Sequence, residues 1–244
     1  MSQKFEALLR LGDSALILGH RVSEWCGHGP YLEEDIALAN VALDLIGQAT
    51  LWLDYAAEVE NAGRSADDLA FLRDAYDFRN LLLVERPNGD FGQTIMRQFL
   101  FDAFSVLQLK QLVDCSDQRI ADIAAKTLKE ATYHLERSSD LVARLGDGTV
   151  ESNQRMQAAL DDLWPYTGEM FTADDIDAAI GLAPENLHKN WLETVASVFT
   201  AGTLELPEST FAHKGGKAGH HSEHLGFLLA EMQWLQRAHP GATW

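Results

Sequence analysis

The sequence predicts an all-α protein built on a four-helix bundle, with additional helices toward the C-terminus. Apolar residues recur at intervals of three and four along most of the chain, and the alternation typical of strands is scarce. Clusters of Gly and Pro separate the helical segments. Because no internal repeat, low-complexity tract or shift in composition marks a boundary, we expect a single domain spanning residues 1–244.

The first two long helices are expected over about residues 3–25 and 33–61. The Cys-Gly-His-Gly-Pro cluster at residues 26–30 ends the first helix, because Gly is flexible and Pro breaks the helical hydrogen-bond pattern. Three acidic residues at 33–35 suit the positive N-terminal end of the second helix. These two segments supply half of the expected bundle.

The third and fourth long helices are expected over about residues 91–115 and 118–145, after a mixed segment at residues 63–90. An Arg-Pro-Asn-Gly-Asp turn precedes the third helix, and Gly146-Asp-Gly148 is suited to cap the fourth. Further helices are expected in the rest of the chain, at about residues 151–164, 173–180, 184–204 and 219–238.

The composition indicates a globular protein that can bury a sizeable core, since 46% of the 244 residues are apolar and 23% are charged. A formal net charge of -18 repels phosphate backbones and anionic headgroups, so we expect neither nucleic acid nor a membrane as a partner. Glu6, Arg10 and Asp13 interrupt the start where a signal peptide needs an apolar core. No later run reaches the roughly 18 uncharged apolar residues of a spanning helix. We therefore expect a cytoplasmic protein, with Cys26 and Cys115 reduced.

Polar residues at helix positions that we expect to face inward form the first candidate site. These inward polar positions are Asp13, Asn40, Asp44, Asp102 and His134. In a four-helix bundle that carries two irons, two helices each supply a Glu and the other two each supply a Glu-x-x-His pair. Here the pairs are incomplete, because Gly47 stands three residues after Asp44 and Ala131 stands three residues before His134.

We expect these five residues to form a hydrogen-bonded polar cluster rather than a metal site, because a buried acid is tolerated when it is paired. Glu130 does not complete the pattern, since it lies four residues before His134 instead of three. An active di-iron centre is the alternative interpretation, and it would need at least one ligand from outside these positions.

A second candidate is the histidine cluster His220, His221 and His224. It is not a His-Glu-x-x-His zinc motif, so we expect a capping and surface cluster instead. The Gly-rich loop before it carries Lys214 and Lys217 but lacks the phosphate-binding Gly-x-x-x-x-Gly-Lys-Ser/Thr pattern. Whether these two lysines approach a phosphate-bearing ligand is left open.

Several segments recur in the same order in one family. They include Leu9-Arg-Leu-Gly-Asp13, Glu24-Trp-Cys-Gly-His28, Asp35-Ile-Ala-Leu-Ala-Asn40, Leu43-Asp-Leu-Ile-Gly-Gln48, Asn80-Leu-Leu-Leu-Val-Glu85, Lys129-Glu-Ala-Thr-Tyr-His-Leu135 and Leu229-Ala-Glu-Met-Gln233. Over nearly its whole length the chain resembles the PaaC family, whose members are subunits of the bacterial phenylacetyl-CoA epoxidases, which are ring-1,2 monooxygenases.

The resemblance implies a ferritin-like helical fold and a role in aerobic phenylacetate catabolism. It implies that a ferritin-like catalytic partner subunit holds the di-iron centre and the coenzyme A thioester. A separate reductase with FAD and an iron-sulfur centre supplies electrons from NADPH in that family. This chain would then be the non-catalytic structural subunit, without catalytic, cofactor-binding or metal-binding residues of its own.

Three questions about function stay open at this point. The chain is expected to pair with the catalytic subunit and the other subunits of the complex, and when alone it could form a homodimer. Two alternatives are an active di-iron oxidase or oxygenase and a generic helical adaptor unconnected with aromatic metabolism. The face that contacts the partner is not evident from the sequence.

Overall fold

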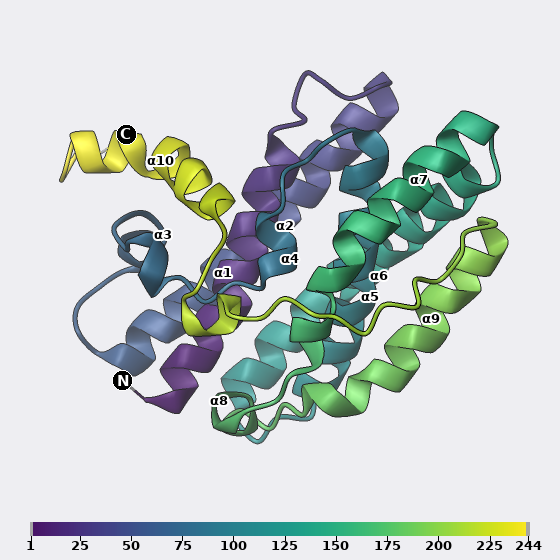
Figure 1. Ribbon diagram of the computed structural model, residues 1–244. Coiled ribbons are helices and arrows are strands. Elements are labelled where there is room, and N and C mark those ends of the chain that lie inside the picture. Colours follow the sequence, from purple (N-terminus) through teal and green to yellow (C-terminus); the bar gives the residue numbers. More distant parts are fainter. Residues whose placement is uncertain (1, 243–244) are drawn as a thin grey trace. The chain divides into compact units, whose positions relative to one another are not determined.

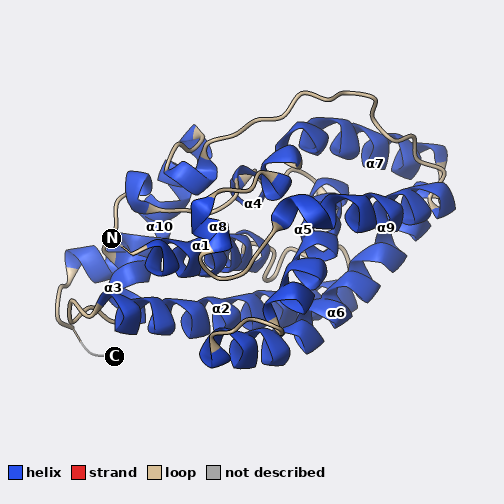
Figure 2. Ribbon diagram, turned by 90° about the horizontal axis from the view of Figure 1, so that it is seen from below, coloured by secondary structure: helices blue, strands red, loops and turns tan. Residues whose placement is uncertain are grey.

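The computed structural model describes residues 2–242, and in this range it consists of helices joined by loops, with no strand (Figure 2). The prediction of an all-α protein is confirmed. The backbone contacts divide the chain into two compact units. Unit 1 comprises residues 1–87 and 214–244, and unit 2 comprises residues 88–213. The expectation of a single domain stays a prediction.

The two long helices of unit 1 are α1 (Gln3–Ser23) and α2 (Leu32–Glu60), which lie side by side (Figure 1). The Ser2 hydroxyl accepts a hydrogen bond from the Phe5 N–H at 3.2 Å and thereby caps the start of α1. α2 ends at Asn61, which adopts the left-handed conformation with φ of 54°. Both helices match the predicted ranges to within two residues at each end.

The core of unit 1 lies mainly between α1 and α2. Its fully buried side chains include Leu8, Ile17, Leu18, Leu38, Leu45 and Trp52. Gly12 permits the close approach of the helices, because a Cβ at this position would lie 2.8 Å from the Leu53 side chain of α2. Burial of each large apolar side chain is worth about 1.5–3 kcal/mol, so this interface is a main source of stability.

Unit 1 is completed by shorter elements: α3 (Ala66–Phe71), η1 (Ala75–Asp77), α4 (Leu82–Glu85), η5 (Gly216–Ala218) and α10 (Glu223–Ala238). α10 packs against α3 and η1. It begins four residues later than predicted. Gly219 has a φ of 84°, and a Cβ there would lie 2.5 Å from the Tyr76 carbonyl oxygen, so the chain turns at this glycine before the helix starts.

Unit 2 contains five α-helices among the residues that the structure describes: α5 (Phe91–Leu112), α6 (Gln118–Gly146), α7 (Val150–Leu163), α8 (Asp175–Ala178) and α9 (His188–Ala201). α5 and α6 lie side by side, and α7 and α9 each pack against both of them (Figure 1). Asp90 and Asp117 cap α5 and α6 through their carboxylates. The predicted helix over residues 184–204 starts as a 3-10 turn (Pro184–Leu187) before it continues as α9.

Aromatic residues and two glycines define the packing inside unit 2. The Phe99 and Phe199 rings meet edge to face with centroids 5.8 Å apart. Trp191 is 1% exposed, and its indole N–H donates to a backbone carbonyl of α5 at 3.1 Å. Gly146 at the end of α6 faces Gly202 after α9 so closely that a Cβ at Gly146 would overlap the Gly202 carbonyl oxygen.

One helix in the described part of the chain, α2, is long and apolar enough to cross a membrane by length and composition alone. Core helices of globular proteins can have the same length and composition. Only 44% of the most apolar 18-residue window of α2 is buried within the chain. α2 is therefore apolar on its exposed side as well as on its buried side.

Candidate functional site

Asp13 is the centre of a buried ion-pair cluster in unit 1. Its carboxylate is fully buried and accepts two hydrogen bonds from the Arg73 guanidinium, one of them from Nη1 at 3.0 Å. The backbone N–H of Arg79 donates a further bond to it at 2.8 Å. Arg73 also donates to the backbone carbonyl of Asp77 at 3.0 Å. Both charges are thus paired and hydrogen-bonded, which is the condition for keeping them inside a protein.

Next to this cluster lies a cavity of about 330 Å³, whose charged lining residues are Glu6, Glu60, Arg64, Arg73, Asp77 and Arg79. Each of its three arginines already has a carboxylate partner. Arg64 pairs with Glu60, and Arg79 pairs with Glu6 at 2.9 Å. The cavity is therefore a balanced network of charges, and it offers no surplus positive charge to an anionic ligand.

A second buried pair, which we call the Glu85–His221 clasp, joins the end of α4 to the segment just before α10. The His221 Nδ1 lies 2.8 Å from the carboxylate of Glu85, and its Nε2 lies 3.0 Å from the backbone carbonyl oxygen of Phe78. The other carboxylate oxygen of Glu85 accepts from the Ser222 N–H at 2.7 Å. Because both ring nitrogens face acceptors, the geometry calls for the doubly protonated imidazolium.

The charges within the clasp shift the pKa of both partners. Burial alone would raise the pKa of Glu85, but the hydrogen bonds from His221 and Ser222 and the charge of His221 outweigh it, and the pKa lies below the ordinary 4.5. Burial alone would lower the pKa of His221, but the bonds to Glu85 and to the Phe78 carbonyl oxygen outweigh it. The pKa of His221 therefore lies above the ordinary 6.5.

Asp102 is the centre of the buried polar cluster in unit 2. It is 2% exposed and accepts hydrogen bonds from the Gln98 amide at 2.6 Å and from the Ser138 hydroxyl at 2.9 Å. Burial raises the pKa of Asp102 to about 6, although the positive charge of the nearby His134 and these hydrogen bonds act in the opposite direction. The carboxyl of Asp102 thus titrates close to neutral pH.

The inward polar positions divide into three that are buried and two that are not. Asp13, Asp102 and His134 are at most 2% exposed. Asn40 is exposed, so the expectation that it faces inward is wrong. Asp44 is half-buried, and its inward position stays a prediction.

The surroundings of Gly47 contradict the interpretation that an iron-binding histidine was lost at this position of α2. Gly47 is exposed, and a Cβ added there would meet nothing within 4 Å. A histidine at this position would point away from the core of unit 1, so Gly47 is not the remnant of an inward ligand. Ala131 on α6 is buried together with His134, and its interpretation as the position of a lost ligand stays a prediction. The buried face of α2 instead carries Leu38, Leu45 and other apolar residues.

Within residues 2–242, no group of three or more His, Cys, Asp and Glu side chains is arranged to hold a metal ion. The buried carboxylates of Asp13 and Glu85 are occupied by arginine, histidine and backbone N–H donors. The described residues therefore do not fit a di-iron centre, which needs several carboxylate and imidazole ligands around one space.

The histidine cluster differs from the expected surface site. The His221 side chain is 4% exposed and belongs to the clasp, whereas His220 is exposed. The expectation of a surface cluster is thus wrong for His221, whose ring is held inside unit 1 by the Glu85 carboxylate and the Phe78 carbonyl oxygen. The sequence also did not indicate that Arg73 pairs with Asp13 or that Glu85 pairs with His221. The available signal for Glu85 was its position as a single acid at the end of a short apolar run.

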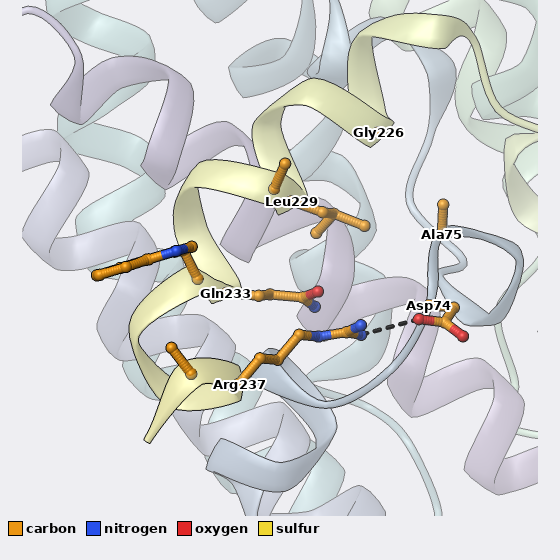
Figure 3. A pocket seen from close by; sticks show the side chains of 9 residues that line it. Asp74, Ala75, Gly226, Leu229, Gln233 and Arg237 are labelled. Carbon is orange, nitrogen blue, oxygen red and sulfur yellow. Dashed lines mark hydrogen bonds and ion pairs between the residues drawn. The ribbon is translucent and has the colours of Figure 1, made fainter. Parts of the chain in front are cut away.

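A surface groove of about 490 Å³ runs along α10 (Figure 3). Its lining residues are Asp74, Ala75, Gly226, Leu229, Ala230, Gln233, Trp234, Arg237 and Ala238. Figure 3 shows Gln233 and Arg237 projecting from α10 toward the segment of Asp74, with which Arg237 forms an ion pair of 2.9 Å. The groove is lined mainly by small and apolar side chains.

Comparisons with known proteins agree with one another over the full chain. Residues 1–244 match the family described as phenylacetic acid catabolic protein. The chain is 49% identical over 249 residues to the PaaC subunit of the 1,2-phenylacetyl-CoA epoxidase of Escherichia coli (strain K12), and the similarity covers 100% of both chains.

Proposed function

The chain belongs to the phenylacetic acid catabolic protein family, and from this premise we propose that it is the PaaC subunit of a 1,2-phenylacetyl-CoA epoxidase in phenylacetate catabolism. In this proposal it is a cytoplasmic, non-catalytic structural subunit that pairs with the di-iron catalytic subunit and stabilises it. The observation that carries the proposal is the 49% identity to a PaaC subunit over the whole length of both chains.

The structural role is supported by how this chain uses its buried charges. Asp13 pairs with Arg73, Glu85 pairs with His221, and Asp102 is hydrogen-bonded to Ser138. These groups hold elements together, and within residues 2–242 no group of three or more His, Cys, Asp and Glu is arranged to hold a metal ion. We propose that the fold is ferritin-like, that the partner subunit holds the di-iron centre, and that FAD and the iron-sulfur centre belong to the reductase.

The exposed side of α2 supports an interaction with a partner subunit. Residues on this side recur at intervals of three and four, and we call them the α2 stripe: Leu32, Ile36, Asn40, Leu43 and Gly47. The three large apolar members are 72%, 53% and 67% exposed, for Leu32, Ile36 and Leu43 respectively. Gly47 projects no side chain, so it allows close approach of another helix. A repeating apolar stripe on a long helix is the surface by which helices pack together.

We propose the α2 stripe as the contact with the catalytic subunit. Obligate interfaces between subunits commonly bury about 2,000 Å² or more and are more apolar than ordinary surface. The stripe supplies an apolar centre for such an interface. Leu43 lies between Asn40 and Gly47 in the stripe and is 67% exposed, so a charge placed there enters the proposed apolar contact.

The experiment that tests this proposal is production of the catalytic subunit with and without this chain. We expect the catalytic subunit to be soluble, loaded with iron and active with phenylacetyl-CoA only when this chain is present. Equal solubility, iron content and epoxidase activity of the catalytic subunit on its own would contradict the structural role.

A pair of variants then tests the assigned surface. Leu43→Arg is expected to weaken the association at least tenfold, whereas Val150→Arg, at an aliphatic residue of α7 that is 77% exposed, is expected to leave it unchanged. Circular dichroism and melting temperature check that both variants are folded. If Leu43→Arg binds as tightly as the unmodified chain, the α2 stripe is not the contact, even though the subunits pair.

A further inference from the structure

We infer that the outer face of α10, together with the groove beside it, is a docking surface for another subunit of the assembly, which contributes an apolar segment flanked by Lys or Arg. The inference rests on the proposed membership in an assembly of several subunits. It goes beyond that proposal because it assigns a second surface of unit 1, distinct from the α2 stripe, and states the chemistry of its occupant.

The first observation is that α10 is fixed at both ends by polar contacts. Just before its first turn, the Glu85–His221 clasp holds the chain. Toward its C-terminal end, the Gln233 amide donates to the backbone carbonyls of Ala70 and Arg73, both at 3.0 Å. Arg237 donates to the same Arg73 carbonyl at 2.8 Å. The helix is therefore held in place before any partner binds, which lowers the entropy cost of binding.

The second observation is that α10 exposes two large aromatic side chains. Phe227 is 71% exposed and Trp234 is 63% exposed. Leu72 and Tyr76, which flank the opposite wall of the groove in sequence, are 53% and 80% exposed. Large aromatic side chains are the residues that most often dominate the energy of protein interfaces, and contiguous apolar patches on a surface mark such interfaces.

The third observation is the shape of the groove that α10 forms with Asp74 and Ala75 (Figure 3). Gly226 and Ala230 lie one turn apart on α10 and both line the groove. A Cβ added at Gly226 would meet nothing within 4 Å. The groove of about 490 Å³ therefore has room for one or two apolar side chains of a partner, with Trp234 beside them.

The charge around the groove selects the occupant. The exposed acidic residues on the elements that form or adjoin it are Asp67, Asp74, Asp77, Glu223 and Glu231. Because the groove-lining Arg237 and Asp74 form an ion pair and neutralise each other, the excess negative charge comes from the other four acids. A second copy of this chain would bring another net charge of -18, and an anionic membrane would also be repelled. A segment with apolar anchors and Lys or Arg on either side is complementary to both the groove and its surroundings.

A site-specific photo-crosslinker tests the inference in the assembled complex. p-Benzoylphenylalanine is placed at Trp234 in one variant and at Tyr133, an exposed residue of α6, in a control variant. We expect the variant at position 234 to crosslink to another subunit, within a segment that carries an apolar anchor flanked by Lys or Arg. Crosslinks from position 234 only to a second copy of this chain, or no crosslink at all, would overturn the inference.

Charge variants at the exposed Ala230 test the occupant's chemistry. Both Ala230→Arg and Ala230→Glu place a long side chain in the groove, but only Arg repels a basic partner. We expect Ala230→Arg and Trp234→Ala each to weaken binding of that subunit at least tenfold, and Ala230→Glu to weaken it less than Ala230→Arg. Equal binding by all three variants, or a larger loss with Glu than with Arg, contradicts the inference.

These outcomes are separate from those of the proposed function. If the unmodified chain fails to associate with any epoxidase subunit, the proposed function fails. If the unmodified chain assembles normally and the α10 variants assemble equally well, only the docking surface on α10 is wrong. Circular dichroism of each variant confirms that loss of binding does not come from unfolding.

Discussion

His221 lies with its Nδ1 2.8 Å from the carboxylate of Glu85, although 136 residues separate the two in the sequence. The contact ties the segment before α10 to the end of α4 within unit 1. Because the Nε2 of the same ring faces the carbonyl oxygen of Phe78, the imidazole has an acceptor on each side. The stability of the C-terminal segment is thereby linked to the protonation of one histidine.

We predict that this link gives unfolding a defined pH dependence. The pKa of His221 is raised above 6.5, so its stabilising contribution is complete below that pH and is lost as the pH rises through the raised value. The pKa of Glu85 is lowered below 4.5, so its contribution is present above that pH and is lost as the pH falls through the lowered value. Urea unfolding should therefore show the full contribution of the clasp between about pH 4.5 and 6.5.

His221→Gln is the matched variant for this prediction. We expect it to lower the free energy of unfolding by about 1–3 kcal/mol at pH 6, because it leaves a buried carboxylate without its charged partner. The difference from the unmodified protein should shrink at alkaline pH, where His221 itself is neutral. His220→Gln, at the exposed neighbouring residue, should change neither the free energy of unfolding nor its pH dependence. A pH-independent difference for His221→Gln would show that the imidazole is not charged in the folded protein.

Removal of Asp13 is expected to be among the most destabilising single changes in unit 1. Asp13→Ala leaves the buried Arg73 without its counter-charge, and loss of one partner of a buried ion pair costs about 3–5 kcal/mol. Glu193→Ala removes one partner of an exposed pair with Lys189 and should cost less than about 1 kcal/mol. Chemical denaturation of both variants at neutral pH makes the comparison. Similar losses for the two variants would contradict the assigned role of Asp13.

Asp102 is predicted to destabilise the folded protein as it ionises. Its pKa of about 6 lies above the ordinary 3.8, so its ionisation lowers the free energy of unfolding. This loss begins at about pH 4 and reaches its full size above about pH 6. Asp102→Asn cannot ionise and should remove this pH dependence. We expect it to be at least as stable as the unmodified protein at pH 7.5, whereas Asp102→Ala should lose about 1–3 kcal/mol by leaving Gln98 and Ser138 without an acceptor.

Thermal unfolding of the Asp102 variants between pH 4 and 8 checks these expectations. If Asp102→Asn retains the same decline in melting temperature between pH 4 and 6 as the unmodified protein, another group is responsible. Direct observation of the Asp102 carboxyl by nuclear magnetic resonance gives an independent value for its pKa.

Two helical glycines offer a test of close packing. Gly146→Ala should destabilise unit 2, because the added methyl group overlaps the carbonyl oxygen of Gly202 and forces the ends of α6 and α9 apart. Gly47→Ala should be neutral or stabilise by up to about 1 kcal/mol, since its Cβ meets open space in a helix. Melting temperatures of the isolated chain distinguish the two. A stable Gly146→Ala variant would mean that the helix ends separate at little cost.

The helical architecture was largely predictable from the sequence, whereas the burial of polar residues on α2 was not. The long helices carry clear three-and-four periodicity and clear stop signals, such as the glycines and proline after α1. On α2, however, the exposed side also carries large apolar residues in its first half, namely Leu32, Ile36 and Leu43. Periodicity alone cannot identify the buried face of such a helix, and Asn40 was therefore placed inward incorrectly.

The other features that the sequence did not predict are contacts between residues far apart in the chain. Asp13 and Asp102 were expected to be buried and paired, and both are. Their partners were not predicted correctly, because Arg73 is 60 residues from Asp13 and Ser138 is 36 residues from Asp102. His221 lies in the segment between Gly219, where η5 ends, and Glu223, where α10 begins, and the periodicity predicts helix over this segment.

The central claim is that this chain is a structural partner of a di-iron subunit and binds no iron itself. Its most direct test is iron analysis of the purified complex before and after separation of the subunits, with protein quantified for each. The account predicts iron near zero in this chain and about two irons per catalytic subunit. Iron near two per molecule of this chain alone would contradict the account, and the protein would then be an oxygenase in its own right.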